Sequence, residues 1–162
     1  MKKIFAICCL VVFLSACKSK SKTVDKTPAV ATKFDVVPAD EIDAAQKKKA
    51  YELGKRVLMT CNTSRFKAFS SSEATQKVID NTTQARLTKT CLKFRLKYGD
   101  FIDLKLVEVL RPKRSKNTIY RYKAIYEKKI ANKELRVTMD ENNKVSALKS
   151  TDWVEKFEPL QR

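Results

Sequence analysis

The sequence predicts an α+β fold, in which N-terminal helices pack on a curved antiparallel sheet of about four strands. From about residue 40 to residue 98, apolar residues recur at the spacing of three to four positions that is typical of amphipathic helices. After Gly99 the period shortens to two, which indicates half-buried strands. Helices followed by a run of consecutive strands favour one helical layer on one face of an antiparallel sheet.

The first helix is expected over about 41–61. Asp40 is a good N-cap residue, and Ile42, Leu53 and Val57 keep helical spacing. Gly54 lies inside this stretch, where glycine costs about 1 kcal/mol relative to alanine. The glycine therefore predicts a close contact with another element.

Two more helical stretches are expected before the sheet. The segment Ser71-Ser72-Glu73 resembles a helix start and precedes Val78 and Ile79. Thr88 is the expected N-cap of the last helix. That helix should end at Tyr98-Gly99, because glycine readily takes the positive φ that ends a helix.

Four strands follow from the alternating pattern. They are expected near 102–110, 119–126, 135–139 and 145–148. Asp140-Glu141-Asn142-Asn143 separates the last two strands, and Asp and Asn favour a hairpin turn because they bond their own backbone and tolerate positive φ.

The N-terminus carries an export signature. Lys2 and Lys3 precede an apolar run, 4–14, that is too short to span a bilayer and is typical of a signal peptide. The motif Leu14-Ser15-Ala16-Cys17 resembles the bacterial lipobox, which implies cleavage after residue 16 and lipidation of Cys17. The alternative is an ordinary signal-peptidase site with an incidental cysteine.

The sequence therefore predicts three segments: a signal peptide at 1–16, a lipidated tether at 17–38 and one domain at 39–162. Lysines alternate with serines after Cys17, and an acyl group beside basic residues forms a two-signal membrane anchor. Lys18 stands where an aspartate would favour inner-membrane retention, so we expect the outer membrane, facing the periplasm.

The chain is strongly basic, with 35 Lys and Arg against 18 Asp and Glu and a formal net charge of +17. Such a field attracts anionic surfaces, so anionic lipid or lipopolysaccharide is an expected partner, whereas export removes the chain from nucleic acid. The expected anion-binding loop contains Arg111, Lys113, Arg114 and Lys116. The alternative is that these cations are solvated and only maintain solubility.

The chain contains no histidine, which excludes imidazole-based triads, dyads and zinc sites. We expect no catalysis, no metal site and no cofactor. Of the five cysteines, Cys8 and Cys9 belong to the signal peptide, so Cys61 and Cys91 remain for the domain. In an oxidising compartment they either form a disulfide or stay as two buried apolar side chains.

The order of elements resembles small exported NTF2-like domains. The features that carry the resemblance are the N-terminal helix, the turn Arg65-Phe66-Lys67-Ala68-Phe69, the stop at Tyr98-Gly99 and the final hairpin from Leu135 to Val145. The resemblance covers about 40–151 and implies a cone with a pocket between helices and sheet. The expected pocket residues are Tyr120, Tyr122, Tyr126, Leu135, Val137 and Met139, with Glu108 as the acid on the same side of the sheet. The alternative is that the tyrosines are half-buried strand residues whose hydroxyls reach solvent.

The opposite sheet face is expected to mix aliphatic side chains with cations. A solvated sheet face is normally polar at every second position, so aliphatic residues there favour a homodimer contact or an envelope protein partner. The expected partner face contains Val107, Val109, Ile125 and Leu148. The alternative is scattered exposed aliphatics, which need no partner.

Taken together, these patterns predict an outer-membrane lipoprotein with a basic binding or scaffold domain in the cell envelope. The alternatives are a carrier of a small apolar ligand and a histidine-free enzyme.

Overall fold

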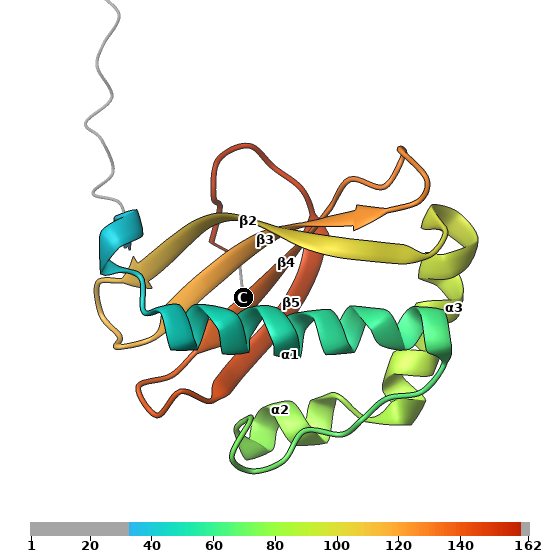
Figure 1. The fold of residues 1–162 in the computed structure, drawn as a ribbon, viewed down its shortest axis with the longest axis horizontal. Helices are drawn as coiled ribbons and strands as arrows, with labels where there is room; N and C mark the ends of the chain where they lie inside the picture. The colour runs from blue at the N-terminus through green and yellow to red at the C-terminus, as the bar shows by residue number, and fades with distance from the viewer. Residues whose placement is uncertain (1–32, 160–162) are drawn as a thin grey trace, which may run out of the picture. The chain divides into compact units, whose positions relative to one another are not determined.

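The computed structural model describes residues 33–159 and confirms the α+β class, with helices on one face of an antiparallel sheet (Figure 1). The elements in chain order are β1 (Phe34–Val36), a 3-10 turn (Ala39–Glu41), α1 (Ala44–Thr63), α2 (Gln76–Asn81), α3 (Gln84–Tyr98), β2 (Phe101–Pro112), β3 (Thr118–Tyr126), β4 (Lys133–Met139) and β5 (Val145–Asp152). The sheet therefore has five strands where the sequence predicts about four.

The additional strand, β1, lies inside the segment expected to be a tether. It pairs with the end of β2, and Phe34 is opposite Pro112 while Val36 is opposite Leu110. Three residues are too few to show an alternating pattern, which is why the sequence does not reveal this strand. Residues 34–38 therefore belong to the domain, and the sheet order is β1-β2-β3-β4-β5.

All three helix starts that the sequence predicts are displaced, and the start expected at Ser71-Ser72-Glu73 lies at Thr75, which precedes α2. Asp40 lies in the 3-10 turn, and Asp43 caps α1 by accepting a 2.8 Å hydrogen bond from the Gln46 amide. Thr83, not Thr88, caps α3, since its side chain accepts from the amide of Arg86. Several Asp and Thr residues near each start can cap a helix, and local sequence does not choose among them.

The helix ends and the glycine contact agree with the expectations. Gly99 follows α3 with φ 77°, and its amide donates to the Arg95 carbonyl. Gly54 is buried where α1 crosses β4: a Cβ on this residue would lie 2.9 Å from Leu135 Cδ2 and 3.0 Å from Val137 Cγ2. The glycine therefore allows α1 to approach the sheet.

Besides a register shift between Phe101 and Asp103, two β-bulges change which side chains face the helices. Val107 is the extra residue between the pairs Leu106–Tyr122 and Glu108–Arg121, and Ser146 is the extra residue opposite Thr138 and Met139. Because a shift of one residue reverses the faces of a strand, every residue after each bulge changes side.

The bulges correct three sequence assignments. Val109 lies opposite Tyr120 and is buried in the helix-facing core, and Leu148 lies opposite Val137 on that same face. Glu108 instead lies opposite Arg121 on the outer face. Of the expected partner face, only Val107 and Ile125 remain outside the core, with 44% and 40% of their surfaces exposed.

Candidate functional site

The residues expected to line a pocket fill the core between α1 and the sheet. All six are buried: Tyr120, Tyr122, Tyr126, Leu135, Val137 and Met139. The hydroxyl of Tyr120 donates to Gln46 Oε1 of α1 at 3.0 Å, and that of Tyr122 reaches the Lys47 carbonyl at 3.5 Å. Burial raises the pKa of Tyr120 and of Tyr126 to about 12, so both phenols stay protonated near neutral pH.

An apolar groove instead opens beside this core, where α1, α2 and α3 meet β5. It has a volume of about 210 Å³ and an apolar lining that includes Leu58, Leu87, Phe94, Leu135 and Leu148. Its polar rim consists of Asn81, Thr82, Thr90, Lys149 and Ser150. A second hollow of about 220 Å³ between α2 and β5 shares Asn81, Thr82, Leu148 and Lys149 with it.

Of the residues that line the groove, only Leu135 is among the pocket residues predicted from the sequence. Sequence reasoning placed Leu148 on the wrong face because the bulge at Ser146 cannot be read from the alternation. A signal was nevertheless available in α3, since Leu87, Cys91 and Phe94 keep helical spacing on the side that faces the domain.

The lining of the groove suits binding and lacks an acid–base pair. No Asp or Glu is among the described residues that line it, and Lys149 is its one charged group. The two carboxyls whose pKa falls to about 2 lie elsewhere: Arg56 lowers the pKa of Glu73, and Tyr51 and Lys55 lower that of Asp103. Both are ionised partners in polar contacts and not proton donors near neutral pH.

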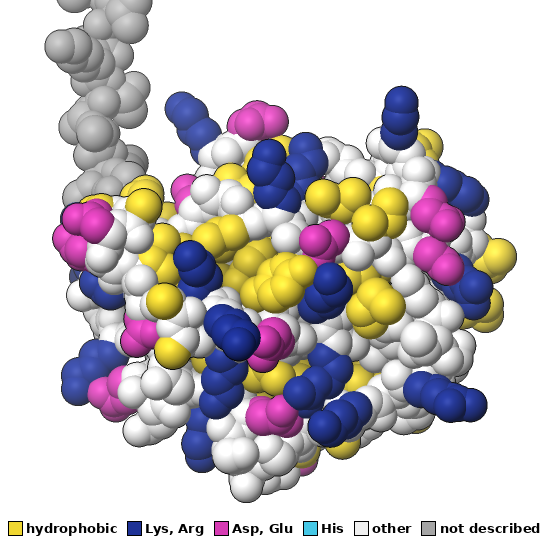
Figure 2. All heavy atoms as spheres, viewed as in Figure 1, with side chains coloured by type: hydrophobic (Ala, Val, Ile, Leu, Met, Phe, Trp, Pro, Cys, Tyr) yellow, Lys and Arg dark blue, Asp and Glu magenta, His cyan; other side chains and the backbone are white. Residues whose placement is uncertain are grey.

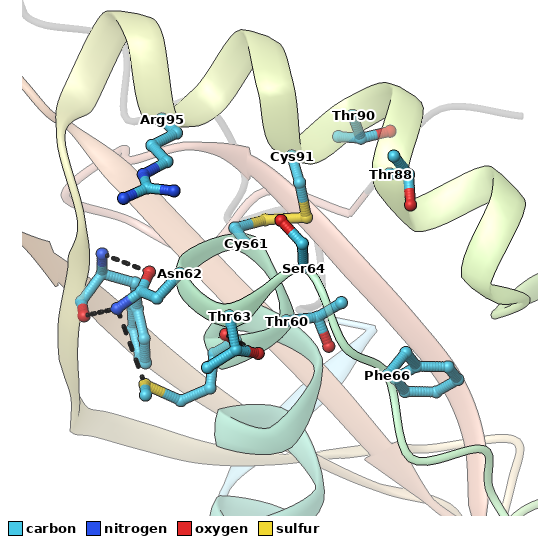
Figure 3. The surroundings of a disulfide bond; sticks show 12 residues. Thr60, Cys61, Asn62, Thr63, Ser64, Phe66, Thr88, Thr90, Cys91 and Arg95 are labelled. Carbon is cyan, nitrogen blue, oxygen red and sulfur yellow. Dashed lines mark hydrogen bonds between the residues drawn. A yellow bond between two sulfur atoms is a disulfide. The ribbon is translucent and has the colours of Figure 1, made fainter.

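The groove is bordered by the Cys61–Cys91 disulfide, which joins α1 to α3 (Figure 3). The two Cα atoms are 4.5 Å apart, within the 7 Å limit for a bridge. Next to it, the side chain of Asn62 binds both backbone groups of Phe101, donating to its carbonyl at 2.7 Å and accepting from its amide at 2.9 Å. The end of α1 is thus attached to both α3 and β2.

The outer sheet face holds a buried charge cluster, which we define as Glu108, Arg121, Glu134 and Arg136. The side chains of Arg121 and Glu134 are both 0% exposed, and Arg121 donates to Glu134 at 2.7 Å and to Glu108 at 2.6 Å. Arg136 donates to the other oxygen of Glu134. Two cations and two carboxylates therefore neutralise one another within the sheet.

The C-terminal segment 153–159 covers this cluster. Trp153 stacks on the Arg121 guanidinium at 4.3 Å and Phe157 on that of Arg136 at 4.5 Å. Arg121 also donates to the Val154 carbonyl, and Arg136 to the Glu158 carbonyl at 2.6 Å. Much of the face expected to meet a partner is therefore covered by the chain itself.

The expected anion-binding loop is partly neutralised. Lys116 pairs with Glu141 at 2.8 Å, Lys113 with Asp35 at 3.4 Å and Arg111 with Glu41 at 3.9 Å. Arg114 is exposed in the same turn. On the face that carries α1, dark blue cations are interspersed with magenta carboxylates and do not form one patch (Figure 2).

Two features are absent from residues 33–159. No group of three or more potential metal-ligating Cys, Asp or Glu residues occurs in this part of the chain. Within the same residues, every helix is too short or too polar to cross a bilayer. The lipobox, the signal peptide and Cys17 lie outside the described residues.

Comparison of the sequence and the fold with protein-family models, curated proteins and solved structures gave no match.

Proposed function

We propose that this chain is an outer-membrane lipoprotein, anchored through Cys17, whose α+β domain binds a partner in the cell envelope and catalyses no reaction. The observation that carries the proposal is the Cys61–Cys91 disulfide. Structural disulfides persist in oxidising compartments such as the bacterial periplasm, which is where the motif Leu14-Ser15-Ala16-Cys17 would deliver the chain.

The groove between the helices and β5 is the proposed binding site. Its volume of about 210 Å³ is below the roughly 300–1,000 Å³ of typical small-molecule pockets. The apolar lining and polar rim suit one or two apolar side chains of a protein partner better than a whole carried ligand. This difference in volume favours the binding or scaffold function over the carrier alternative.

We also propose that the domain is NTF2-like, as the resemblance of its sequence implies. In its favour are the long N-terminal helix across the sheet and the consecutive antiparallel strands that follow α3. The filled core beneath α1 means that any ligand of this domain would enter at the groove and not at the centre of the sheet.

The anchor is tested by the intact mass of protein extracted from membranes. We expect a diacyl or triacyl adduct at Cys17, and we expect Cys17→Ala to move the chain to the soluble fraction. An unmodified Cys17 in membrane-extracted protein contradicts the proposal.

The groove is tested separately with a photo-crosslinking amino acid at Lys149, on the rim, and at Lys123, exposed on the outer face. We expect envelope-protein adducts at Lys149 that Leu148→Asp abolishes and Ile125→Asp does not. Equal adducts at both positions would refute the site. A small apolar molecule retained on the purified chain in native mass spectrometry would instead support the carrier function.

A further inference from the structure

The outward face of α3 is unusual for a solvent-exposed helix. Leu92 and Leu96 lie one turn apart on it, and 64% and 72% of their surfaces are exposed. The side that faces the domain carries Cys91 and Tyr98, both buried, so these two leucines do not contribute to the core. The turn that holds Ile130, which is 71% exposed, lies beside the end of α3, because Lys128 donates to the Leu96 carbonyl at 3.0 Å.

The charge of α3 has a single sign. The helix sequence contains no Asp or Glu, and its basic residues are Arg86, Lys89, Lys93, Arg95 and Lys97. Arg95 pairs with Asp100 at 2.9 Å, but Lys89 and Lys93, which flank Leu92, have no carboxylate within 4 Å in the described part of the chain. These lysines contrast with the loop cations Arg111, Lys113 and Lys116, which have such neighbours.

We propose that this surface, made by Leu92, Leu96, Lys89 and Lys93, docks on an anionic phospholipid bilayer. Exposed leucines can enter the boundary between headgroups and acyl chains while lysine stems extend toward the phosphates. A basic residue near an anionic surface adds attraction that salt screens. A second copy is a poor occupant, because pairing two α3 helices would bring like charges together.

The proposed anchor is long enough for this orientation. Residues 17–32 can span roughly 53 Å at full extension. The 20 residues of α1, which runs from the β1 end of the domain to α3, span about 30 Å (Figure 1). The inference rests on the proposed anchor at Cys17, which would hold the domain near a membrane. Its test uses an unacylated chain, so a negative result for α3 is distinguishable from a negative result for the anchor.

The test is vesicle co-sedimentation of the chain from residue 17 onward, carrying Cys17→Ala. We expect binding to phosphatidylglycerol-containing vesicles that pure phosphatidylcholine does not support and that salt weakens. Leu92→Ser with Leu96→Ser should reduce binding at least tenfold. Lys89→Gln with Lys93→Gln should reduce it severalfold and flatten its salt dependence. All four residues are exposed, so the variants should fold, and circular dichroism checks this.

Two double variants with the same kinds of substitution at other exposed positions serve as controls. Val107→Ser with Ile125→Ser removes two exposed aliphatics from the sheet, and Lys47→Gln with Lys48→Gln removes two exposed lysines from α1. Both control chains should bind like the parent. As a direct measure of insertion, Leu96→Trp should show quenching by brominated lipids above the background of Trp153.

The inference would be overturned by no binding to anionic vesicles, by equal losses in the α3 and control variants, or by no added quenching at position 96. Binding of α3 to an acidic protein without vesicle binding would also overturn it, and would reassign the surface to a protein partner.

Discussion

At the scale of single residues, the charge cluster of the outer face separates this sheet from an ordinary solvated one. Arg121 has several acceptors at once: the carboxylates of Glu108 and Glu134 and the carbonyl of Val154. A buried guanidinium is tolerated only when its donors are satisfied. An intact buried ion pair adds little net stability. Removing one partner destabilises the protein strongly, because the remaining charge stays buried without a counter-charge.

Arg121→Met should therefore lower the free energy of unfolding by about 3–5 kcal/mol, because it leaves Glu134 without its main partner. Urea denaturation followed by the fluorescence of Trp153, the single tryptophan, measures the change. Lys105→Met on the neighbouring strand β2, at an exposed position, should stay within about 0.5 kcal/mol. Similar losses in the two variants would contradict the role given to the cluster.

The lowered pKa of Glu73 predicts that the free energy of unfolding falls at acidic pH. Hydrogen bonds from Arg56 lower its pKa from 4.5 to about 2, so its contribution is fully present above about pH 4.5 and is lost as the pH falls toward 2. After solvent screening we expect this contribution to be about 1–2 kcal/mol. Unfolding at pH 6 and pH 2.5 should show a smaller acid loss for Glu73→Gln than for wild type. Glu52→Gln, in the exposed Lys48–Glu52 pair, should match wild type.

At the scale of elements, the helical layer is fixed at both ends of α1. Asp43 caps its start, Gly54 brings its middle close to β4, and Cys61 and Asn62 attach its end to α3 and β2. The helix α3 is otherwise lightly packed, with only Cys91 and Tyr98 buried along its length. The disulfide is therefore a principal restraint on α3.

Cys61→Ser with Cys91→Ser should lower the free energy of unfolding by about 3–4 kcal/mol, since the bridge closes a loop with a sequence separation of 30 residues. Amide exchange should accelerate first in α3. Reduction of the wild type should reproduce the effect, whereas a reductant should leave the double variant unchanged. Free-thiol labelling of both cysteines in native protein would contradict the bridge.

At the scale of the whole molecule, the sheet lies between two covers, the helices on one face and the C-terminal segment on the other. Phe157 contacts Phe34 of β1 with ring centroids 4.9 Å apart, so the segment links β1 to the side chains of β3 and β4. The two termini of the described chain thus stabilise each other.

Truncation after Asp152 should destabilise the domain by several kcal/mol, because it removes Trp153 and Phe157 and uncovers Arg121 and Arg136. Thermal unfolding measures the loss. A chain in which Lys156 alone becomes Ala should behave like wild type, because this residue is exposed within the same segment. A truncated chain as stable as the full one would show that the cover is dispensable.

The sequence by itself determined the fold class, the number of helices, the stop at Gly99, the close packing at Gly54 and the pair of cysteines available for a bridge. These features depend on local periodicity, on the conformational freedom of glycine and on composition, which neighbours along the chain report directly. The expected export and lipidation at Cys17 also depend on a local motif, and they remain predictions.

Only the tertiary structure decided which face each strand residue occupies, where the helices begin and what covers the sheet. A bulge at Val107 or Ser146 leaves the alternating pattern intact on each side of it while reversing the faces, so Val109, Leu148 and Glu108 exchanged sides. The C-terminal segment covers Arg121 through contacts between residues more than 30 positions apart. No local sequence pattern predicts such long-range contacts, because their energy depends on burial, and burial arises only when the whole chain is folded.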